Sequence, residues 1–277
     1  MKIKTIFILF NIVIIFSFLI IYFMPLIILG WDFTTVFWSK NWFLPILFVT
    51  VLGILNTYFI LNWGLFKRLE RQDWDGLIIY LEDKIYNKKH VQNRYIRILI
   101  NAYLVKSKME GITRLEVHLR ENKPAMVPRF ALQLGIPHLL KNSPEEMENY
   151  FKEFAGNEKS EEKYWISWNY AFALLLQQKK EEAKNILDTL ILRVKEPILN
   201  LLILYLMDTL TDKFPAVDAK IQAGKTSLRK RFTPGLWQKE VNKNRENIQI
   251  VILAKLVREA GDWLFKENGD KKKDGAE

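Results

Sequence analysis

The tripeptide Gly224-Lys225-Thr226 comes closest to a chemical motif in this chain, because a phosphate-binding P-loop ends in Gly-Lys-Ser/Thr. That loop also has a glycine five residues before its second glycine, and it follows a hydrophobic strand. Ala219 stands where the first glycine is required, and the segment before it does not alternate as a strand does. We therefore do not predict a nucleotide site.

The residue types needed for metal binding or nucleophilic catalysis are sparse. His90, His118 and His138 are too far apart in sequence to share a helical turn, and no acidic metal-ligand motif accompanies them. The chain has no cysteine, which excludes disulfides, a thiolate nucleophile and Cys-based metal sites. Serine-hydrolase elbows and dinucleotide fingerprints are also missing from the sequence. We predict no catalytic residue, no metal and no cofactor, and hence a protein that is not an enzyme.

Anion binding is the chemistry that the sequence does offer. Five cations and no acid occur between positions 220 and 231, namely Lys220, Lys225, Arg229, Lys230 and Arg231. This basic patch either contacts anionic lipid, at about 1 kcal/mol for each residue near the surface, or forms a solvated helix face. Nucleic acid is not expected as a partner, because no nucleic-acid-binding motif accompanies the charge.

The segments that must position these residues differ in their content of charged residues, so one part of the chain suits lipid and the other suits water. The chain has 41 Lys and Arg and 31 Asp and Glu, but positions 1–66 hold only Lys2, Lys4, Asp32 and Lys40. Uncharged runs cover positions 5–31 and 41–66, each longer than the roughly 20 residues that cross a bilayer. We predict a transmembrane hairpin over residues 1–66, with spans at about 5–30 and 43–66.

Aromatic and basic residues mark the ends of these predicted spans. Trp and Tyr favour the headgroup level of a membrane, and Lys and Arg favour its cytoplasmic side. The predicted interface residues are Trp31, Trp38, Trp42, Trp63, Lys67 and Arg68. Basic residues stand at both outer flanks, whereas the connection over 31–42 contains only Lys40. This pattern predicts a two-pass protein with both ends in the cytoplasm.

Beyond residue 66 the apolar residues recur with a helical period, and no strand is needed. We expect helices over 73–87, 91–106, 109–121, 126–141, 144–156, 162–178, 180–194, 197–210, 215–230 and 239–266. Pro137 should kink the helix that contains it. The uncharged run at 197–207 is too short to span a membrane and predicts a buried helix. The last helix carries the one-sided apolar stripe of a cap, and positions 268–277 form a charged tail that we expect to be disordered.

A polar turn followed by an apolar stripe recurs along the chain. The corresponding positions in each copy of this pattern are Gly76, Gly111, Glu146 and Glu182, which are separated by 35, 35 and 36 residues. At this spacing the chain resembles the tetratricopeptide (TPR) family, whose repeat is a helix–turn–helix of about 34 residues. The residues that match the family pattern are Tyr103 at its first-helix aromatic, Leu134-Gly135 and Tyr170-Ala171 where paired helices approach, Ala183 at its small second-helix residue, and Pro124 at its closing proline. The resemblance covers roughly residues 70 to 195.

This resemblance implies a TPR-like α-solenoid over 67–267 that offers a concave surface to a protein or peptide partner. Two spans before cytoplasmic TPR units are also similar to the architecture of bacterial inner-membrane TPR assembly factors, which implies that location. The sequence thus predicts an all-α protein, with a two-helix transmembrane hairpin followed by a TPR-like solenoid. It would act as a membrane-anchored scaffold for protein–protein interaction or complex assembly at the bacterial inner membrane, with the lipid bilayer and a protein or peptide as its partners. The alternative is a catalytic or non-catalytic subunit of a larger membrane enzyme or transport complex, with the hairpin as its working part.

Overall fold

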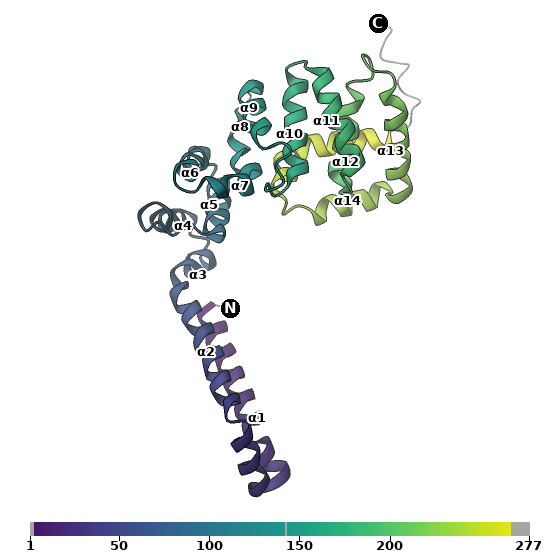
Figure 1. Cartoon of the computed structure of the whole chain (residues 1–277). Helices are drawn as coiled ribbons and strands as arrows, with labels where there is room; N and C mark the ends of the chain where they lie inside the picture. The colour runs from purple at the N-terminus through teal and green to yellow at the C-terminus, as the bar shows by residue number, and fades with distance from the viewer. Residues whose placement is uncertain (1–2, 142, 267–277) are drawn as a thin grey trace. The chain divides into compact units, whose positions relative to one another are not determined.

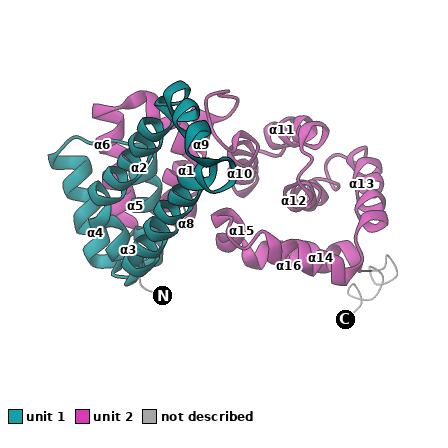
Figure 2. Cartoon of the chain, turned by 90° about the horizontal axis from the view of Figure 1, so that it is seen from below, with its two compact units in different colours: residues 1–108 teal, residues 109–277 magenta. Residues whose placement is uncertain are grey.

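The computed structural model describes residues 3–141 and 143–266, and every regular element in these ranges is helical. The predicted all-α fold class is therefore confirmed. Figure 1 shows the helices in chain order, and Figure 2 colours two compact units, Met1–Lys108 and Met109–Glu277. The predicted tail at 268–277 lies outside the described residues.

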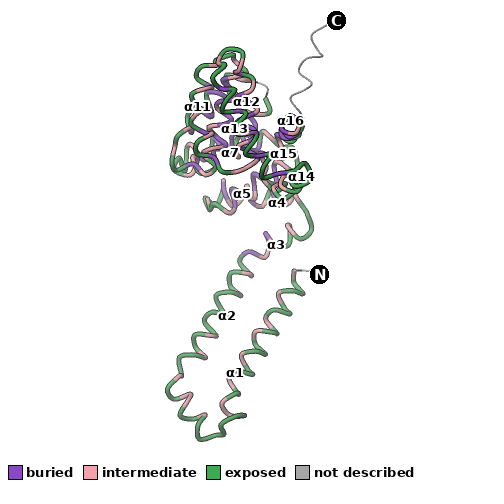
Figure 3. The backbone as a smooth tube through the Cα atoms, turned by 90° about the vertical axis from the view of Figure 1, so that its right-hand side faces the viewer, coloured by how far each residue is buried: buried purple, intermediate pink, exposed green. Residues whose placement is uncertain are grey.

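The first unit begins with two long apolar helices, α1 (Ile3–Lys40) and α2 (Phe43–Leu61). Both are long and apolar enough to cross a membrane, and neither contains a buried residue. Figure 3 shows this exposure along the whole hairpin. Stacked rings hold the two helices together, Phe7 on Phe59 and Phe18 on Phe48, each with centroids 3.9 Å apart. The apolar surface of the hairpin thus faces outward rather than into a protein core.

The hairpin differs from the prediction at both of its turns. Residues 31–40 are helical rather than an open connection, and the chain changes direction at Gly30, whose φ of 82° favours glycine. The second apolar helix ends at Leu61 instead of reaching position 66, because Asn62 has a non-helical φ of −101°. The Asn62 Nδ2 donates back to the carbonyl oxygen of Tyr58 at 2.8 Å. A separate short helix, α3 (Trp63–Glu70), follows.

A helix pair completes the first unit. Its elements are α4 (Trp74–Glu82), the π-helical turn η1 (Asp83–Asn87) and α5 (Asn93–Val105). Asp73 starts α4 as its N-cap, because its carboxylate accepts a hydrogen bond from the Gly76 amide at 2.9 Å. Helices α4 and α5 pack together, and the buried Tyr103 donates its hydroxyl proton to Glu82 at 2.7 Å.

The second unit contains the remaining helices. They are α6 (Met109–Asn122), η2 (Pro124–Met126), α7 (Val127–Leu134), α8 (Ile136–Leu140), α9 (Pro144–Phe154), α10 (Lys163–Leu176), α11 (Lys180–Arg193), α12 (Pro197–Asp208), α13 (Val217–Arg231), α14 (Pro234–Lys243), α15 (Ile248–Ile252) and α16 (Ala254–Phe265). Helix α10 packs between α9 and α11, and α12 packs against α11, α13 and α16. Helix α12 is the most buried of them, as the uncharged run at 197–207 predicted.

Helix positions follow the predicted register. Gly76, Gly111, Glu146 and Glu182 are each the third residue of their helix, α4, α6, α9 and α11. These four helices therefore start 35, 35 and 36 residues apart. The small residues Ala171 and Ala183 are fully buried in the adjacent helices α10 and α11, which pack together.

Two predicted helices are interrupted. The segment 126–141 breaks at Gly135 into α7 and α8, immediately before Pro137, as that proline led us to expect. The predicted helix 239–266 is wrong as a single element, because α14 ends at Lys243 and α15 ends at Ile252, and α16 begins at Ala254. Asn247 provides the physical reason for the first break, since its Oδ1 accepts a hydrogen bond from the Gln249 amide at 3.0 Å and caps α15.

Candidate functional site

The predicted basic patch does not form one surface. Lys225 is only 5% exposed, with its Nζ 4.0 Å from the centre of the Trp263 ring. Arg229 donates from Nε to the carbonyl oxygen of Leu264 at 2.6 Å. These two cations therefore attach α13 to α16. The predicted patch is corrected at Lys225, which is buried against α16 and does not offer its charge to an anionic partner, whereas Arg229 stays exposed beside its hydrogen bond. Lys220, Lys230 and Arg231 remain exposed.

The tripeptide Gly224-Lys225-Thr226 and the residue His138 occupy structural positions in the fold. Gly224-Lys225-Thr226 lies inside helix α13, so its backbone amides are not arranged in a phosphate-binding loop. His138 stacks on Tyr150 with centroids 4.5 Å apart, and its Nε2 lies 3.5 Å from Glu116 Oε2. In the part of the chain that the structure describes, no group of three metal-ligating side chains is assembled.

The predicted interface residues occupy the two ends of the hairpin. Trp31, Trp38 and Trp42 lie at the closed end, where Trp38 stacks on Tyr22 with centroids 4.5 Å apart. Trp63, Lys67 and Arg68 belong to α3, at the open end. The guanidinium of Arg68 lies over the Tyr80 ring at 4.8 Å. The hairpin therefore carries aromatic residues at both ends of its apolar length.

Sequence reasoning missed a polar cluster at the open end of the hairpin. The Arg94 guanidinium of α5 donates to the Tyr58 hydroxyl and to Asn62 Oδ1, both at the end of α2. It also lies over the rings of Tyr58 and Tyr95, at 5.5 and 5.3 Å. Only the tertiary structure brings α2 and α5 together, so the sequence had no local signal for this contact.

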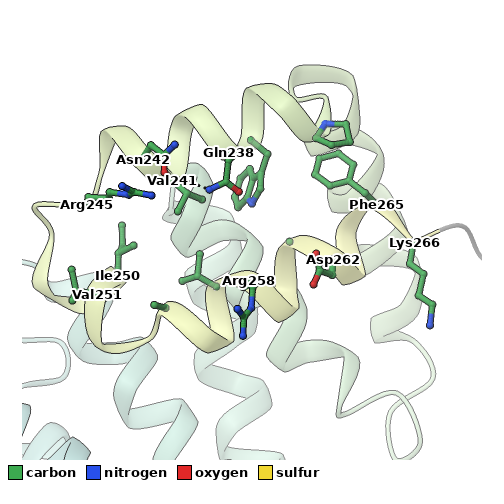
Figure 4. A pocket seen from close by; sticks show the side chains of 15 residues that line it. Gln238, Val241, Asn242, Arg245, Ile250, Val251, Arg258, Asp262, Phe265 and Lys266 are labelled. Atoms are coloured by element: carbon green, nitrogen blue, oxygen red, sulfur yellow. Dashed lines mark hydrogen bonds between the residues drawn. The ribbon is translucent and has the colours of Figure 1, made fainter.

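A groove lies in the second unit between α14 and the α15–α16 segment, with a volume of about 960 Å³. Figure 4 shows the side chains that line it. Its floor consists of Trp237, Ile250 and Val257, each at most 5% exposed. The more exposed apolar residues Val251 and Ala254 form its lip. The groove can therefore receive apolar side chains.

The groove exists because the chain turns sharply on both sides of α14. Thr233 starts the helix as an N-cap that accepts from the Leu236 amide at 3.4 Å, and Pro234 occupies its first position. Gly261 allows α16 to approach α14, because a β-carbon at that position would lie 2.9 Å from the Trp237 Nε1. Helix α16 is itself held by contacts with α12 and α13.

The rim of the groove is polar and mainly positive. Arg245, Arg258 and Lys266 line it, against the single acid Asp262. Within the described residues, neither arginine takes part in an ion pair. Gln238 and Asn242 pair along α14, where Gln238 Nε2 donates a hydrogen bond to Asn242 Oδ1 at 3.4 Å. An apolar floor with a cationic rim suits a segment that has one apolar face and acidic flanks.

The sequence did contain signals for this groove. Thr233-Pro234 is a helix start, and Asn244 and Asn247 mark a helix end and a new cap. The predicted helix over 239–266 ignored both, and so it merged the two walls of the groove into one element. The apolar stripe of the predicted cap is correct, since Leu253, Val257, Ala260 and Leu264 are buried.

Comparison with known proteins places the second unit in a family. The chain is 25% identical over 232 residues to an uncharacterized protein of Treponema pallidum (strain Nichols), and the match covers 79% of this chain and 74% of that protein. No solved structure matches the chain. The model of the family described as "Uncharacterised Treponema protein" matches residues 111–266, which is more than half of the chain and contains the α14–α16 groove. The chain therefore belongs to this Treponema protein family.

Proposed function

We propose that this protein is a membrane-anchored helical scaffold whose α14–α16 groove binds an acidic amphipathic segment of a partner protein. The observation that carries the proposal is the combination of apolar floor and cationic rim in one open groove. Charge complementarity selects the partner, because an acidic flank would meet Arg245 and Arg258, whereas a basic one would be repelled. The role is that of a binding protein rather than an enzyme.

The two apolar helices support membrane anchoring. The core helix of a soluble protein is buried against its own fold, but α1 and α2 have no buried residue. Exposed apolar helices of this length suit the hydrocarbon core of a bilayer. Lys67 and Arg68 beside the second span favour a cytoplasmic helical domain, and the resemblance to TPR assembly factors favours the bacterial inner membrane.

The regular spacing of helix starts supports a TPR-like solenoid as the architecture that presents the groove. In such a solenoid each helix pair contacts its neighbours, and the last helices close the array. Helices α14 to α16 come last among the described elements, so on this proposal the closing helices of the solenoid also bind the partner.

Site-specific photo-crosslinking in cells tests this proposal. A crosslinking residue replaces Val251 at the lip of the groove, and the matched control replaces Lys255 on the same segment, which is exposed and does not line the groove. We expect one partner at Val251, crosslinked through a segment with apolar and acidic residues, and no such product at Lys255. Arg245→Glu with Arg258→Glu should abolish the product, and reversing the acids of the partner segment should restore it. Equal products at both positions would contradict the proposal.

A second candidate function places the activity in the hairpin. Asn56 Nδ2 donates to Asn11 Oδ1 at 2.8 Å between the two apolar helices, and the two amides border a hollow of about 260 Å³. Polar side chains in a membrane commonly bind other helices. A crosslinking residue at the outward-facing Ile27, which is 78% exposed, would favour this candidate if it captured a membrane protein while Val251 captured none.

A further inference from the structure

A second groove lies on the other side of α13, between that helix, α11 and the start of α12. Its volume is about 620 Å³. Three cations line it, Lys195, Lys220 and Arg231, and no acidic side chain of the described residues does. Its apolar lining includes Ile191, Leu192 and Leu228. The groove thus joins an apolar wall to positive charge.

Helix geometry explains why Lys220 and Arg231 share this groove while Lys225 and Arg229 do not. Eleven residues are close to three full turns at 3.6 residues per turn, so Lys220 and Arg231 lie on one face of α13. Lys225 and Arg229 lie on the opposite face, against α16. Lys195 joins from the end of α11 and had no place in the predicted basic patch.

Two of the three charges are uncompensated. Lys220 Nζ lies 2.6 Å from Asp188 Oδ1, so its charge is largely matched. Lys195 and Arg231 form no ion pair within the described part of the chain. Cations at helix C-termini offset the helix dipole, but that effect does not require them to line a common hollow. The groove therefore attracts an anion at Lys195 and Arg231.

The lining favours an aliphatic chain over a peptide backbone. A bound peptide brings N–H and C=O groups that need hydrogen-bond partners. The uncharged polar side chains that line the groove are Asn200 and Ser227, and the Asn200 amide already donates to the Val194 carbonyl oxygen at 3.4 Å. Leu192, which is 86% exposed, extends the apolar surface at the edge of the groove. An acyl chain would cover these apolar groups without unpaired polar atoms.

We infer that the α11–α13 groove binds an anionic phospholipid, with the phosphate at Lys195 and Arg231 and an acyl chain along Ile191, Leu192 and Leu228. The inference rests on the membrane anchoring in the proposed function, which keeps lipid close to the chain, but not on the α14–α16 groove. It assigns a ligand to a surface that the partner segment does not use.

Photolabelling tests this lipid site. The full chain is placed in phosphatidylcholine nanodiscs that contain trace phosphatidylglycerol with a photoreactive acyl chain, and the labelled peptides are mapped by mass spectrometry. We expect label on 191–195 and 220–231, and none there from photoreactive phosphatidylcholine. Lys195→Gln with Arg231→Gln should weaken labelling by about fivefold for each cation removed, hence roughly 25-fold in all. Lys230→Gln with Lys239→Gln removes the same charge outside the groove and should change it less than twofold.

Further experiments distinguish a lipid headgroup from free phosphate as the bound anion, and they exclude misfolding as the cause of lost labelling. Leu192→Gln changes a side chain already in solvent, so it preserves the fold and should still weaken labelling by severalfold. Inorganic phosphate at millimolar concentration should not compete. Competition by phosphate or by an acidic peptide such as hexaglutamate, equal losses in the groove and control variants, or label confined to other helices would each overturn the inference. If the lipid labelling is absent but crosslinking at Val251 persists, the lipid inference is refuted and the proposed partner-binding groove is not.

Discussion

The indole nitrogen of Trp237 lies 2.9 Å from the point that a β-carbon on Gly261 would occupy. This contact brings α14 and α16 together at the floor of the partner-binding groove. The separation is shorter than β-carbon contacts in folded proteins, so any larger residue at position 261 must displace the indole. The width of the groove therefore depends on this one glycine.

Gly261→Ala should displace Trp237 and reduce partner binding. Overpacking destabilises the fold by about 1 to 3 kcal/mol, whereas replacing a helical glycine with alanine stabilises it by up to about 1 kcal/mol. We therefore expect a net destabilisation of up to about 2 kcal/mol. The thermal midpoint of the full chain in nanodiscs and the crosslinking yield at Val251 measure both effects. Gly235→Ala is the control, because no atom lies within 4 Å of its added β-carbon. Equal midpoints for the two variants would show that the indole is not held as described.

Glu148→Gln should destabilise the packing of α9, α10 and α11. The Glu148 Oε2 accepts hydrogen bonds from Lys179 Nζ at 2.5 Å and from Gln177 Nε2 at 2.6 Å. Hydrogen bonds to a charged group are worth about 1.5 to 3 kcal/mol, so a loss near the lower end of this range is expected for a partly exposed pair. Thermal unfolding at neutral pH measures the loss. Glu145→Gln, on the exposed face of α9, should leave the midpoint unchanged.

The same pair predicts a pH dependence. The hydrogen bond from Lys179 lowers the pKa of Glu148, although burial acts in the opposite direction. A carboxylate whose pKa is lower in the folded state stabilises the fold above its unfolded pKa of about 4.3, and this contribution is lost as pH falls through the folded pKa. The stability difference between wild type and Glu148→Gln should therefore shrink below about pH 4.3. A difference that persists unchanged to lower pH would contradict the ion pair.

Arg94→Leu should loosen the hairpin from the first helix pair. The substitution removes the guanidinium that bonds Tyr58 and Asn62. Two charge-assisted hydrogen bonds are lost, and we expect a destabilisation of about 1.5 to 3 kcal/mol. Arg94→Lys keeps the charge but cannot donate in the same fork, so its stability should fall between those of wild type and Arg94→Leu. Protease cleavage in the exposed 88–92 connection reports the loosening, and Arg71→Leu on the nearby exposed surface should leave cleavage unchanged.

Local signals in the sequence carried most of the helix assignments. Helical periodicity and caps such as Ser143-Pro144 mark positions that the chain's own neighbours determine, and the helices there match within a few residues. The last helix failed because Asn244 and Asn247 interrupt a continuous apolar pattern, and a single capping residue outweighed that pattern. The second span ended early for a similar reason at Asn62.

The sites depended on contacts that no local signal carries. The basic run in α13 was visible, but which of its cations face solvent depends on the packing of α16 against one side of that helix. Lys195 joins Arg231 only because α11 and α13 border the same hollow. The α14–α16 groove likewise required a turn between two helices that the sequence pattern had merged.

Cysteine labelling in intact cells tests the central claim most directly, that the hairpin crosses a membrane and holds the helical domain in the cytoplasm. The chain has no cysteine, so single substitutions report without background. Ser39→Cys places the label at the closed end of the hairpin, and Lys239→Cys places it on the exposed surface of α14. In a bacterial host treated with a membrane-impermeant maleimide, we predict labelling of Ser39→Cys in intact cells and of Lys239→Cys only after lysis. Labelling of Lys239→Cys in intact cells, or recovery of both variants in the soluble fraction, would contradict the account.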